Sequence, residues 1–169
     1  MSENGSHLLQ PRQFMAAMSQ VPTGVCLVAV RDDLDDLITT ASSLVSVSLD
    51  PPLISVCTDR NSYFGEVMSR SPRWALTVLA QAQRHLAARF AARGRPSARL
   101  LLEGEAHHRG AASHALIVDG AVMALEFRTV QRIPAGDHYI IVAEIISVDY
   151  LDVDREPLVR HRRGYRGLT

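Results

Sequence analysis

Two adjacent prolines, Pro51 and Pro52, divide the most strand-like stretch of the chain, residues 39–57, into two parts. Apolar and polar residues alternate over 44–47, before the prolines, and a mainly apolar run follows over 53–57. Proline has no amide hydrogen to donate to a sheet, so it is confined to turns, strand edges and the first residues of strands. The stretch therefore predicts two strands joined at the prolines.

The rest of the chain contains many strand candidates and few helices. Apolar and alternating patterns predict strands within residues 22–30, 73–80, 99–108, 122–133 and 138–153, and helices within 10–19, 59–72 and 80–94. The acidic segment 31–37 is expected to be a solvated hairpin loop. Strands and helices do not alternate regularly, which favours a mainly β fold with a few helices, an antiparallel barrel, over a doubly wound sheet. We expect one domain over 1–169, with a flexible N-terminus at 1–12.

Composition excludes several classes of protein and partner. Hydrophobic residues make up 47% of the chain and charged residues 21%, which is typical of a globular protein and unlike a disordered one. Acidic and basic residues balance at 18 each, so we expect neither nucleic acid nor an anionic membrane as a partner. No apolar run approaches the roughly 20 residues of a membrane-spanning helix, and residues 1–13 lack the pattern of a secretory signal. These features predict a cytoplasmic protein.

Cysteine and histidine residues do not suggest a metal site. Cys26 and Cys57 both lie in strand-like runs and are expected to be buried free thiols, with a disulfide as the alternative. His107 and His108 are adjacent, so on a strand their side chains point to opposite faces, and no further ligands complete a set with His114. We expect no metal.

Small hydroxyl side chains are concentrated before the prolines, at Thr39, Thr40, Ser42, Ser43, Ser46 and Ser48. A strand and its exit lined by such residues allow a planar ligand to lie against the backbone, with N–H and O–H groups directed at its edge. The pyrimidine edge of a flavin offers matching acceptors. The alternative is a solvated strand face.

A second polar segment, Arg60-Asn61-Ser62, comes directly before a predicted short helix. Amide groups at a helix N-terminus, a serine hydroxyl, an asparagine amide and a nearby arginine are usual components of a phosphate site. The alternative is that Asn61 or Ser62 only caps the helix.

Seven segments occur together in an order and spacing that resemble the flavin reductase-like family: VPTGVCLVAV, TASSLVSVSLDPPLISVC, NSYFGEVMS, LTVLAQAQRHLAARFA, AVMALEFRTV, GDHYIIVAEI and PLVRHRRGYRGL. The resemblance runs from about Phe14 to Leu168. It implies an FMN-binding split β-barrel, antiparallel and Greek-key-like, that forms a homodimer with the flavin near the subunit interface.

The resemblance also implies which residues meet the ligands. Flavin contacts would come from Pro22, Thr23, Gly24, Thr40, Ala41, Ser42, Ser43, Ser46, Val47, Ser48, Cys57, Thr58 and Asp59, with the phosphate held by Asn61, Ser62 and Arg89. The nicotinamide would lie near Gly136, Asp137 and His138, with His138 as the catalytic-site residue that positions it, and Arg163 and Tyr165 would help to close over the dinucleotide.

By the same resemblance, the protein would be an NAD(P)H:flavin oxidoreductase. It would transfer a hydride from nicotinamide C4 to flavin N5 and supply reduced FMN, or FAD, to a separate flavin-dependent monooxygenase component. Two alternatives stay open: a non-catalytic flavin-binding module, and another split-barrel flavin oxidase, such as one acting on a pyridoxine phosphate. The choices between NADH and NADPH, between FMN and FAD, and between bound cofactor and released substrate also stay open.

Four positions depart from the usual pattern of the family. Ile38 stands where a glycine is common, Thr77 where many relatives have asparagine, Phe127 in place of a frequent cysteine, and Arg160 in place of an aromatic residue. Thr77 would alter ring contacts or core hydrogen bonding, and Arg160 would change how the dinucleotide is gripped.

Overall fold

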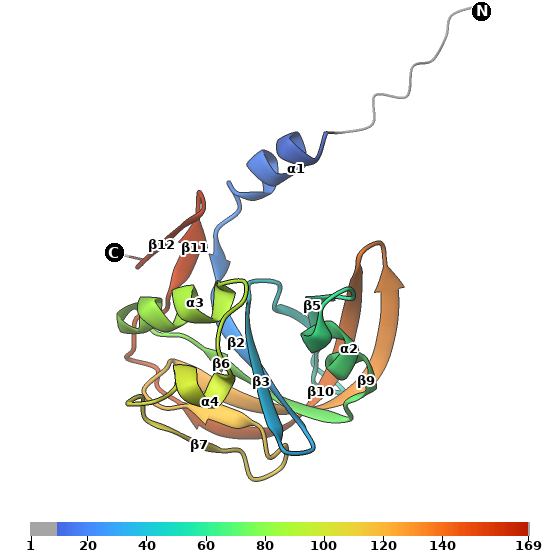
Figure 1. Ribbon diagram of the computed structural model, residues 1–169, viewed down its shortest axis with the longest axis vertical. Helices are drawn as coiled ribbons and strands as arrows, with labels where there is room; N and C mark the ends of the chain where they lie inside the picture. Colours follow the sequence, from blue (N-terminus) through green and yellow to red (C-terminus); the bar gives the residue numbers. More distant parts are fainter. Residues whose placement is uncertain (1–9, 169) are drawn as a thin grey trace, which may run out of the picture.

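The computed structural model describes residues 10–168. Its largest sheet is antiparallel and has seven strands, in the order β3 (Asp35–Ala41), β2 (Cys26–Asp32), β6 (Arg73–Val78), β9 (Met123–Ala135), β10 (His138–Leu151), β5 (Leu53–Asp59) and β4 (Val45–Ser48) (Figure 1). The outer strands β3 and β4 do not pair with each other, so the curved sheet is a barrel that is open along one side. The expectation of a mainly β, antiparallel split barrel is confirmed.

Two smaller sheets and four helices complete the described structure. One sheet contains β1 (Thr23–Gly24), β11 (Val159–His161) and β12 (Gly164–Arg166), and the other contains β7 (His107–Arg109) and β8 (Leu116–Val118). The helices are α1 (Pro11–Met18), α2 (Tyr63–Arg70), α3 (Arg84–Ala91), which follows a 3-10 turn (Gln81–Gln83), and α4 (Ala98–Leu101). None of the helices within residues 10–168 is long and apolar enough to cross a membrane.

The N-terminal helix α1 stands away from the body of the molecule and buries none of its residues (Figure 1). Pro11 occupies its first turn, where a missing amide hydrogen costs nothing. Of the segment expected to be flexible, Pro11 and Arg12 belong to this helix, and residues 1–9 lie outside the described part of the chain.

The two prolines form the predicted turn. Strand β4 ends at Ser48, residues 49–52 turn, and β5 begins at Leu53. The carbonyl of Pro52 accepts a hydrogen bond of 3.0 Å from the amide of Ile145 in β10. The turn is therefore attached to the next strand of the sheet.

The segment 99–108 is not the strand that its apolar run predicts. It contains most of α4 and a turn, and β7 begins only at His107. Ala98 and Leu102 lie four positions apart and are buried in the same apolar cluster, which is the spacing of one helical face. The prediction was wrong because the apolar run packs with helical spacing against elements that are distant in the sequence.

The acidic segment 31–37 also differs from its prediction. Strand β2 runs to Asp32 and β3 begins at Asp35, so the turn consists of Asp33 and Leu34 alone. Asp33 has a φ of 52°, in the left-handed region that aspartate adopts more readily than most residues. Asp36 is buried, so the expectation of a solvated loop is wrong at this residue.

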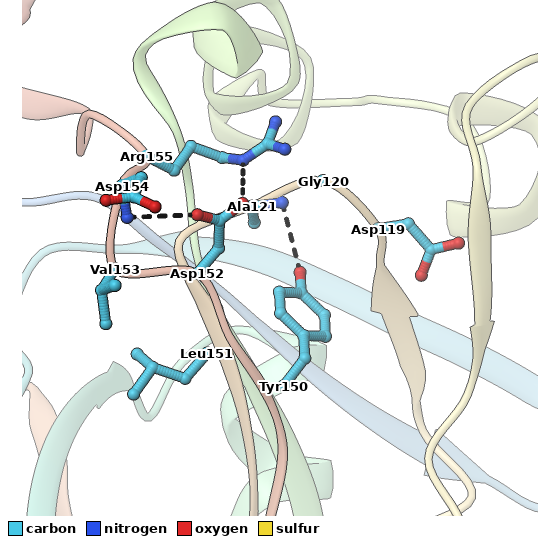
Figure 2. A pocket seen from close by; sticks show the side chains of 9 residues that line it. All are labelled: Asp119, Gly120, Ala121, Tyr150, Leu151, Asp152, Val153, Asp154 and Arg155. Carbon is cyan, nitrogen blue, oxygen red and sulfur yellow. Dashed lines mark hydrogen bonds and ion pairs between the residues drawn. The ribbon is translucent and has the colours of Figure 1, made fainter.

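Tyr150 holds the far end of β10 to the turn before β9. Its hydroxyl donates to the carbonyl of Val118, at 2.5 Å. It also accepts from the amide of Ala121, at 3.3 Å (Figure 2). Burial raises the pKa of Tyr150 to about 12, so the phenol keeps its proton. A hollow of about 480 Å³ beside it, bordered by Asp152 and Arg155, contains none of the residues that the sequence assigns to a ligand.

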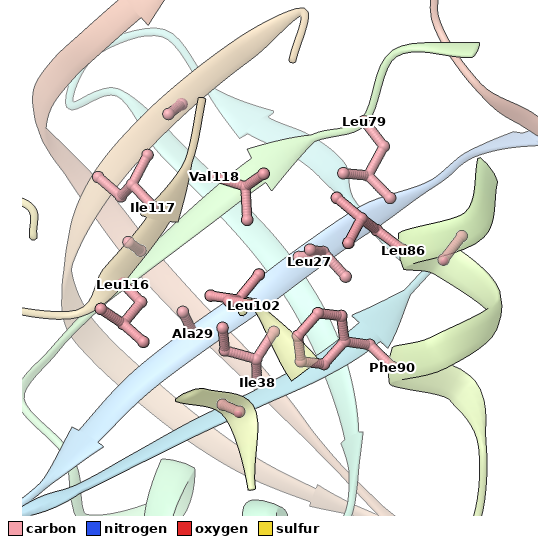
Figure 3. Packing of buried hydrophobic residues seen from close by; sticks show 14 of the residues in the cluster. Leu27, Ala29, Ile38, Leu79, Leu86, Phe90, Leu102, Leu116, Ile117 and Val118 are labelled. Carbon is pink, nitrogen blue, oxygen red and sulfur yellow. The ribbon is translucent and has the colours of Figure 1, made fainter. Parts of the chain in front are cut away.

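Strand β2 is buried on both faces, and its alternate side chains enter two different apolar clusters. Leu27 and Ala29 lie in the first cluster with side chains from α3, α4 and β8 (Figure 3). Val28 and Val30 lie in the second with side chains from α2, β5 and β10. A shift of one residue would exchange the two sets, so the register of β2 is strongly specified.

The second cluster contains a stacked pair, Trp74 and Phe127, whose ring centroids are 4.4 Å apart. The indole N–H of Trp74 donates to the hydroxyl of Thr129 at 3.1 Å, which satisfies the one polar group of the pair. Phe127 is fully buried, so this departure from the family pattern is a packing residue of the core.

Both cysteines are free thiols, but only one is buried. Cys26 lies in the second cluster, and burial raises the pKa of its thiol to about 12. Cys57 is exposed on β5. The expectation of two buried thiols therefore holds for Cys26 and is wrong for Cys57, because β5 has one face on the core and one outside it.

Asp36 joins three distant segments through ion pairs. Its carboxylate accepts two hydrogen bonds of 2.8 Å from Arg109 in β7 and one of 2.6 Å from Arg99 in α4. Burial alone would raise the pKa of this carboxyl, but the hydrogen bonds from Arg109 and Arg99 outweigh it and hold the pKa below its usual range. The side chain of Asp36 is 1% exposed, so its charge is compensated almost entirely by these two arginines.

Replacing Asp36 with asparagine should destabilise the fold, since Asp36→Asn keeps the shape and removes the charge. We expect the free energy of unfolding at pH 7 to fall by about 1–3 kcal/mol, measured by urea denaturation. Because the folded pKa is lowered, the contribution is present above the unfolded pKa, near about 3.9, and is lost as pH falls through the folded value.

The matched control is Asp33→Asn in the exposed turn of the same hairpin, which should change the free energy of unfolding by no more than about 0.5 kcal/mol. Equal effects of the two substitutions would contradict the role given to Asp36.

His108 makes a second link between distant strands. Its Nδ1 lies 2.6 Å from Asp119, between β8 and β9, and its Nε2 lies 2.9 Å from Asp149 in β10. Burial opposes the charged ring, but the hydrogen bonds with the two carboxylates outweigh it and raise the pKa of His108. When it is protonated, the ring donates to both carboxylates and ties the β7–β8 sheet to β10.

The link through His108 should make stability depend on pH. Because the folded pKa is raised, its contribution is fully present below the unfolded pKa, about 6.5, and is lost as pH rises through the folded value. The difference in unfolding free energy between wild type and His108→Gln should be larger at pH 5.5 than at pH 9, by urea denaturation at both values. His107→Gln serves as the control, since His107 contacts only a backbone carbonyl, that of Glu105. The interpretation fails if both variants show the same pH dependence.

Candidate functional site

The open side of the barrel is bridged by Ser43, just beyond the end of β3. Its hydroxyl accepts a hydrogen bond of 2.8 Å from the amide of Cys57 in β5 and lies 3.4 Å from the carbonyl of the same residue. Thr40 donates to the carbonyl of Ala87 in α3, at 3.0 Å. Two of the hydroxyls expected at a ligand edge thus also fasten β3 to its neighbours.

A pocket of about 480 Å³ opens between α1, β1, the segment after β3 and the β11–β12 hairpin. We call it the α1 pocket. Four residues predicted from the sequence line it: Thr23, Ser42, Ser43 and Arg163. Its apolar side comes from α1, through Phe14, Met15 and Met18, which sequence reasoning placed on a helix and did not connect with a site. An apolar wall with a few convergent polar groups suits a planar ligand with a polar edge.

Gly24 follows Thr23 and pairs with Val159 of β11. A Cβ atom added at Gly24 would meet nothing within 4 Å, so the space beside this backbone is open. Pro22 precedes the same short strand. The arrangement leaves room for a ligand to approach the backbone of residues 22–24.

The C-terminal hairpin β11–β12 forms another wall of the α1 pocket. The guanidinium of Arg160 lies 5.6 Å from the ring centroid of Tyr165, and the amide of Arg162 donates to the carbonyl of Ser19 at 2.7 Å. The tip of the hairpin is thereby attached to the end of α1. Arg160, which departs from the family pattern, lines the pocket, so its substitution alters the site directly.

The other departures lie away from this pocket. Thr77 is buried on β6 between Leu27 of β2 and Ala124 of β9. Ile38 packs in the first apolar cluster.

Ser62 caps α2, as predicted. Its hydroxyl accepts from the amide of Gly65 at 3.0 Å and donates to the carbonyl of Asp59 at 2.7 Å. The backbone amide of Asn61 donates to the Asp59 carboxylate at 2.9 Å. A Cβ at Gly65 would lie 1.9 Å from the Asp59 carbonyl oxygen, so only glycine fits there. The turn that carries Asn61 and Ser62 is therefore tight and well determined.

Antiparallel pairing of β5 with β10 brings the predicted nicotinamide residues beside this turn. His138 is opposite Asp59, and the amide of Arg60 donates to the carbonyl of Asp137 at 3.0 Å. Gly136 has a φ of 62°, which glycine adopts without strain. Asp59, Asn61 and Ser62 thus lie next to Gly136–His138, although the two groups are far apart in the sequence.

His138 is held by its neighbour. Its Nδ1 lies 2.7 Å from the carboxylate of Asp137, and this hydrogen bond with His138 holds the pKa of Asp137 below its usual range. Nδ1 is occupied by Asp137, and Nε2 has no hydrogen-bond partner among residues 10–168. The half-exposed imidazole is therefore oriented and available to a ligand.

The structure does not bring every predicted residue together. Arg89 donates to Glu105 at 2.9 Å and does not line the pocket that Ser62 borders. The predicted pairing of Arg89 with the phosphate residues is therefore not observed, because Glu105 already binds its guanidinium. Ser62 instead lines a pocket with Arg95, a residue that sequence reasoning missed. The only sequence signal at Arg95 is its position between Gly94 and Pro96, which indicates an ordered turn.

The β4 residues Ser46, Val47 and Ser48 lie on the outer strand that pairs with β5 and do not line the α1 pocket. Thr58 is buried opposite Tyr139 of β10. Within residues 10–168, no three His, Cys, Asp or Glu side chains are arranged to hold a metal ion.

Comparisons with known proteins show the family and the fold of the chain. A family model described as the flavin reductase-like domain matches residues 18–169. The NADH-dependent FMN reductase AsuE2 of Streptomyces nodosus subsp. asukaensis is 36% identical over 156 residues, which cover 92% of this chain and 84% of the relative. Actinorhodin polyketide dimerase of Streptomyces coelicolor is 41% identical over 133 residues, covering 78% and 72%. The structure of BorF, the flavin reductase component of a bacterial two-component tryptophan halogenase, has a TM-score of 0.87 at 33% identity and covers 94% of this chain and 98% of that one.

Proposed function

Because the chain belongs to the flavin reductase-like family, we propose that it transfers a hydride from NADH to FMN or FAD and supplies the reduced flavin to a separate flavin-dependent monooxygenase component. The family match over residues 18–169 carries the reaction class. NADH is the proposed donor because the relative AsuE2 is named as NADH-dependent, and the separate partner follows from the similarity to the reductase component of a two-component halogenase.

The flavin site in this proposal extends from the α1 pocket to the cap of α2. The ring lies against Thr23, Ser42 and Ser43, where open space beside Gly24 and the apolar wall of α1 fit a planar group. The ribityl chain follows β5 from Cys57 to Asp59. The phosphate lies at Asn61 and Ser62, where the N-terminus of α2 favours an anion. Arg89 is left out because Glu105 binds its guanidinium.

The protein contributes position and a polar edge, and a bound flavin supplies the electron acceptor. Asp137 orients His138 so that Nε2 is free to accept a hydrogen bond from a nicotinamide carboxamide. Arg163 and Tyr165, on the C-terminal hairpin, are placed by that hairpin's attachment to α1 and help to cover the dinucleotide. These groups act by holding two rings in contact, which is the main requirement of hydride transfer.

A homodimer is part of the proposal. Phe14, Met15 and Met18 on α1 are each about half exposed, at 55%, 52% and 51%, and the same side chains border the α1 pocket. A second copy that covers α1 would bury these apolar groups and close the ring site. A cytoplasmic location is consistent with the two free thiols, since disulfides are rare in reducing compartments.

A second candidate function is favoured by one relative, the actinorhodin polyketide dimerase, which is 41% identical. A role in joining two polyketide molecules would use the α1 pocket for a polyketide instead of a flavin. Reduction of free flavin by the purified protein distinguishes the two functions, since it needs no polyketide.

The test of the reductase is anaerobic bleaching of flavin absorbance, at roughly 450 nm, with purified protein, FMN or FAD, and NADH or NADPH. Rapid bleaching at catalytic protein concentrations is expected, with NADH as the better donor. Reaction without protein is the control. If flavin binds but stays oxidised with both donors, the protein is a non-catalytic flavin-binding module and the proposal is wrong.

The role of His138 is tested by His138→Ala. The KM for NADH should rise about fivefold or more, which corresponds to the loss of one hydrogen bond, while the Kd for FMN stays within about twofold. Steady-state kinetics and fluorescence titration measure the two quantities, and His107→Ala is the control on a distant strand. An equal loss of affinity for NADH and FMN would show that His138 only supports the local structure.

A further inference from the structure

A second pocket, of about 420 Å³, lies between β3, the start of α2 and the segment 94–98. We call it the Arg95 pocket. Ser62, the cap of α2, lines it together with Tyr63, Arg95 and Ser97. The proposed flavin site reaches Ser62 with its phosphate, so the Arg95 pocket lies beside any group attached beyond that phosphate.

Arg95 is fixed in place without losing its capacity to bind an anion. One nitrogen of its guanidinium donates to the carbonyl of Ile38 at 2.8 Å, and another to the carbonyl of Ala92 at 3.2 Å. A guanidinium has five N–H groups, so donors remain after these two bonds. Gly94, with a φ of 66°, and Pro96 shape the turn on either side. The side chain is therefore preorganised.

The charge of Arg95 is uncompensated within residues 10–168. None of the ion pairs there includes it, and burial alone lowers its pKa. Of the two carboxylates that border the pocket, Asp36 is bound by Arg99 and Arg109, and Asp35 is exposed to water. A partly buried cation without a carboxylate partner favours an anionic ligand.

The pocket also has surfaces that suit a base. The ring of Tyr63 is about half exposed, and Pro96, in the loop between α3 and α4, lines the same pocket. The Tyr63 hydroxyl donates to Asp32 at 2.9 Å, which fixes the ring at the pocket wall. Stacking of a nucleobase on an aromatic ring is independent of base identity, and the volume falls within the range of small-molecule pockets.

We propose that the Arg95 pocket binds a nucleoside phosphate, the adenosine monophosphate half of FAD or of the nicotinamide dinucleotide, with Arg95 donating to its phosphate. The inference rests on the proposed function, because that function places a flavin phosphate at Ser62. FAD is the favoured source, since its adenosine phosphate is attached directly to that phosphate. FMN lacks this half and does not use the pocket.

Binding of FAD, FMN and NAD⁺ to the wild type and to two variants tests the inference; the oxidised dinucleotide is used because it does not reduce the flavin. Arg95→Ala removes the cation, and Ser97→Asp adds a negative charge while keeping a residue favoured at a helix N-cap. By fluorescence titration, each variant should raise the Kd for FAD by about tenfold or more and leave the Kd for FMN within about twofold of the wild-type value. If the affinity for NAD⁺, titrated with saturating oxidised FMN, falls while the affinity for FAD does not, the nucleoside phosphate is that of the dinucleotide.

Arg93→Ala is the matched control, because Arg93 is an exposed arginine two positions away that does not line the pocket. Unchanged binding of all three ligands in both variants would overturn the inference. So would equal weakening of FMN and FAD, or an effect of Arg93→Ala as large as that of Arg95→Ala. Binding is measured without turnover, so these outcomes are separate from a failure of the wild type to reduce flavin.

Discussion

Burial of β2 on both faces is the constraint on which the architecture depends. Leu27 and Ala29 face one apolar cluster and Val28 and Val30 face the other, so β2 needs packed elements on each side. Helices α3 and α4 cover the first side, and α2 with the far strands of the barrel covers the second. The neighbouring strand β3 is thereby held next to α3, and its free end leads to the open side of the barrel.

The candidate site is assembled from the ends of elements that this packing fixes. Thr40 ties β3 to α3, Ser43 ties the following segment to Cys57 in β5, and β5 pairs with β10. Small hydroxyl residues therefore have two effects. Their hydrogen bonds support the strand ends, and their small side chains leave space for a ligand to reach the backbone. A site made mainly of backbone and small side chains suits a protein whose reactive group belongs to a cofactor.

Tertiary contacts determine which arginines are paired with a carboxylate and which can bind a ligand. The chain contains no lysine, and the environments of its arginines differ widely. Arg99 and Arg109 neutralise buried Asp36, and Arg89 is bound by Glu105. Arg95 has no carboxylate partner among the described residues and borders a pocket. Of these four arginines, only Arg95 is free to add affinity for a ligand phosphate.

The sequence by itself determined much of the local structure, and the family. The turn at Pro51, the cap at Ser62 and the alternation of β2 depend on short-range rules of proline geometry, capping and strand periodicity. The family motifs identified the barrel and assigned Asp59–Ser62 and Gly136–His138, which β-pairing then brought together.

Only the tertiary structure decided which face each segment presents and which partner each side chain finds. It decided that 98–101 form a helix, that Cys57 is exposed and Asp36 buried, and that Arg89 forms an ion pair with Glu105. These outcomes depend on contacts between residues tens of positions apart. Propensity and spacing do not encode such contacts, because the energy of a buried charge or an apolar run is set by whatever packs against it.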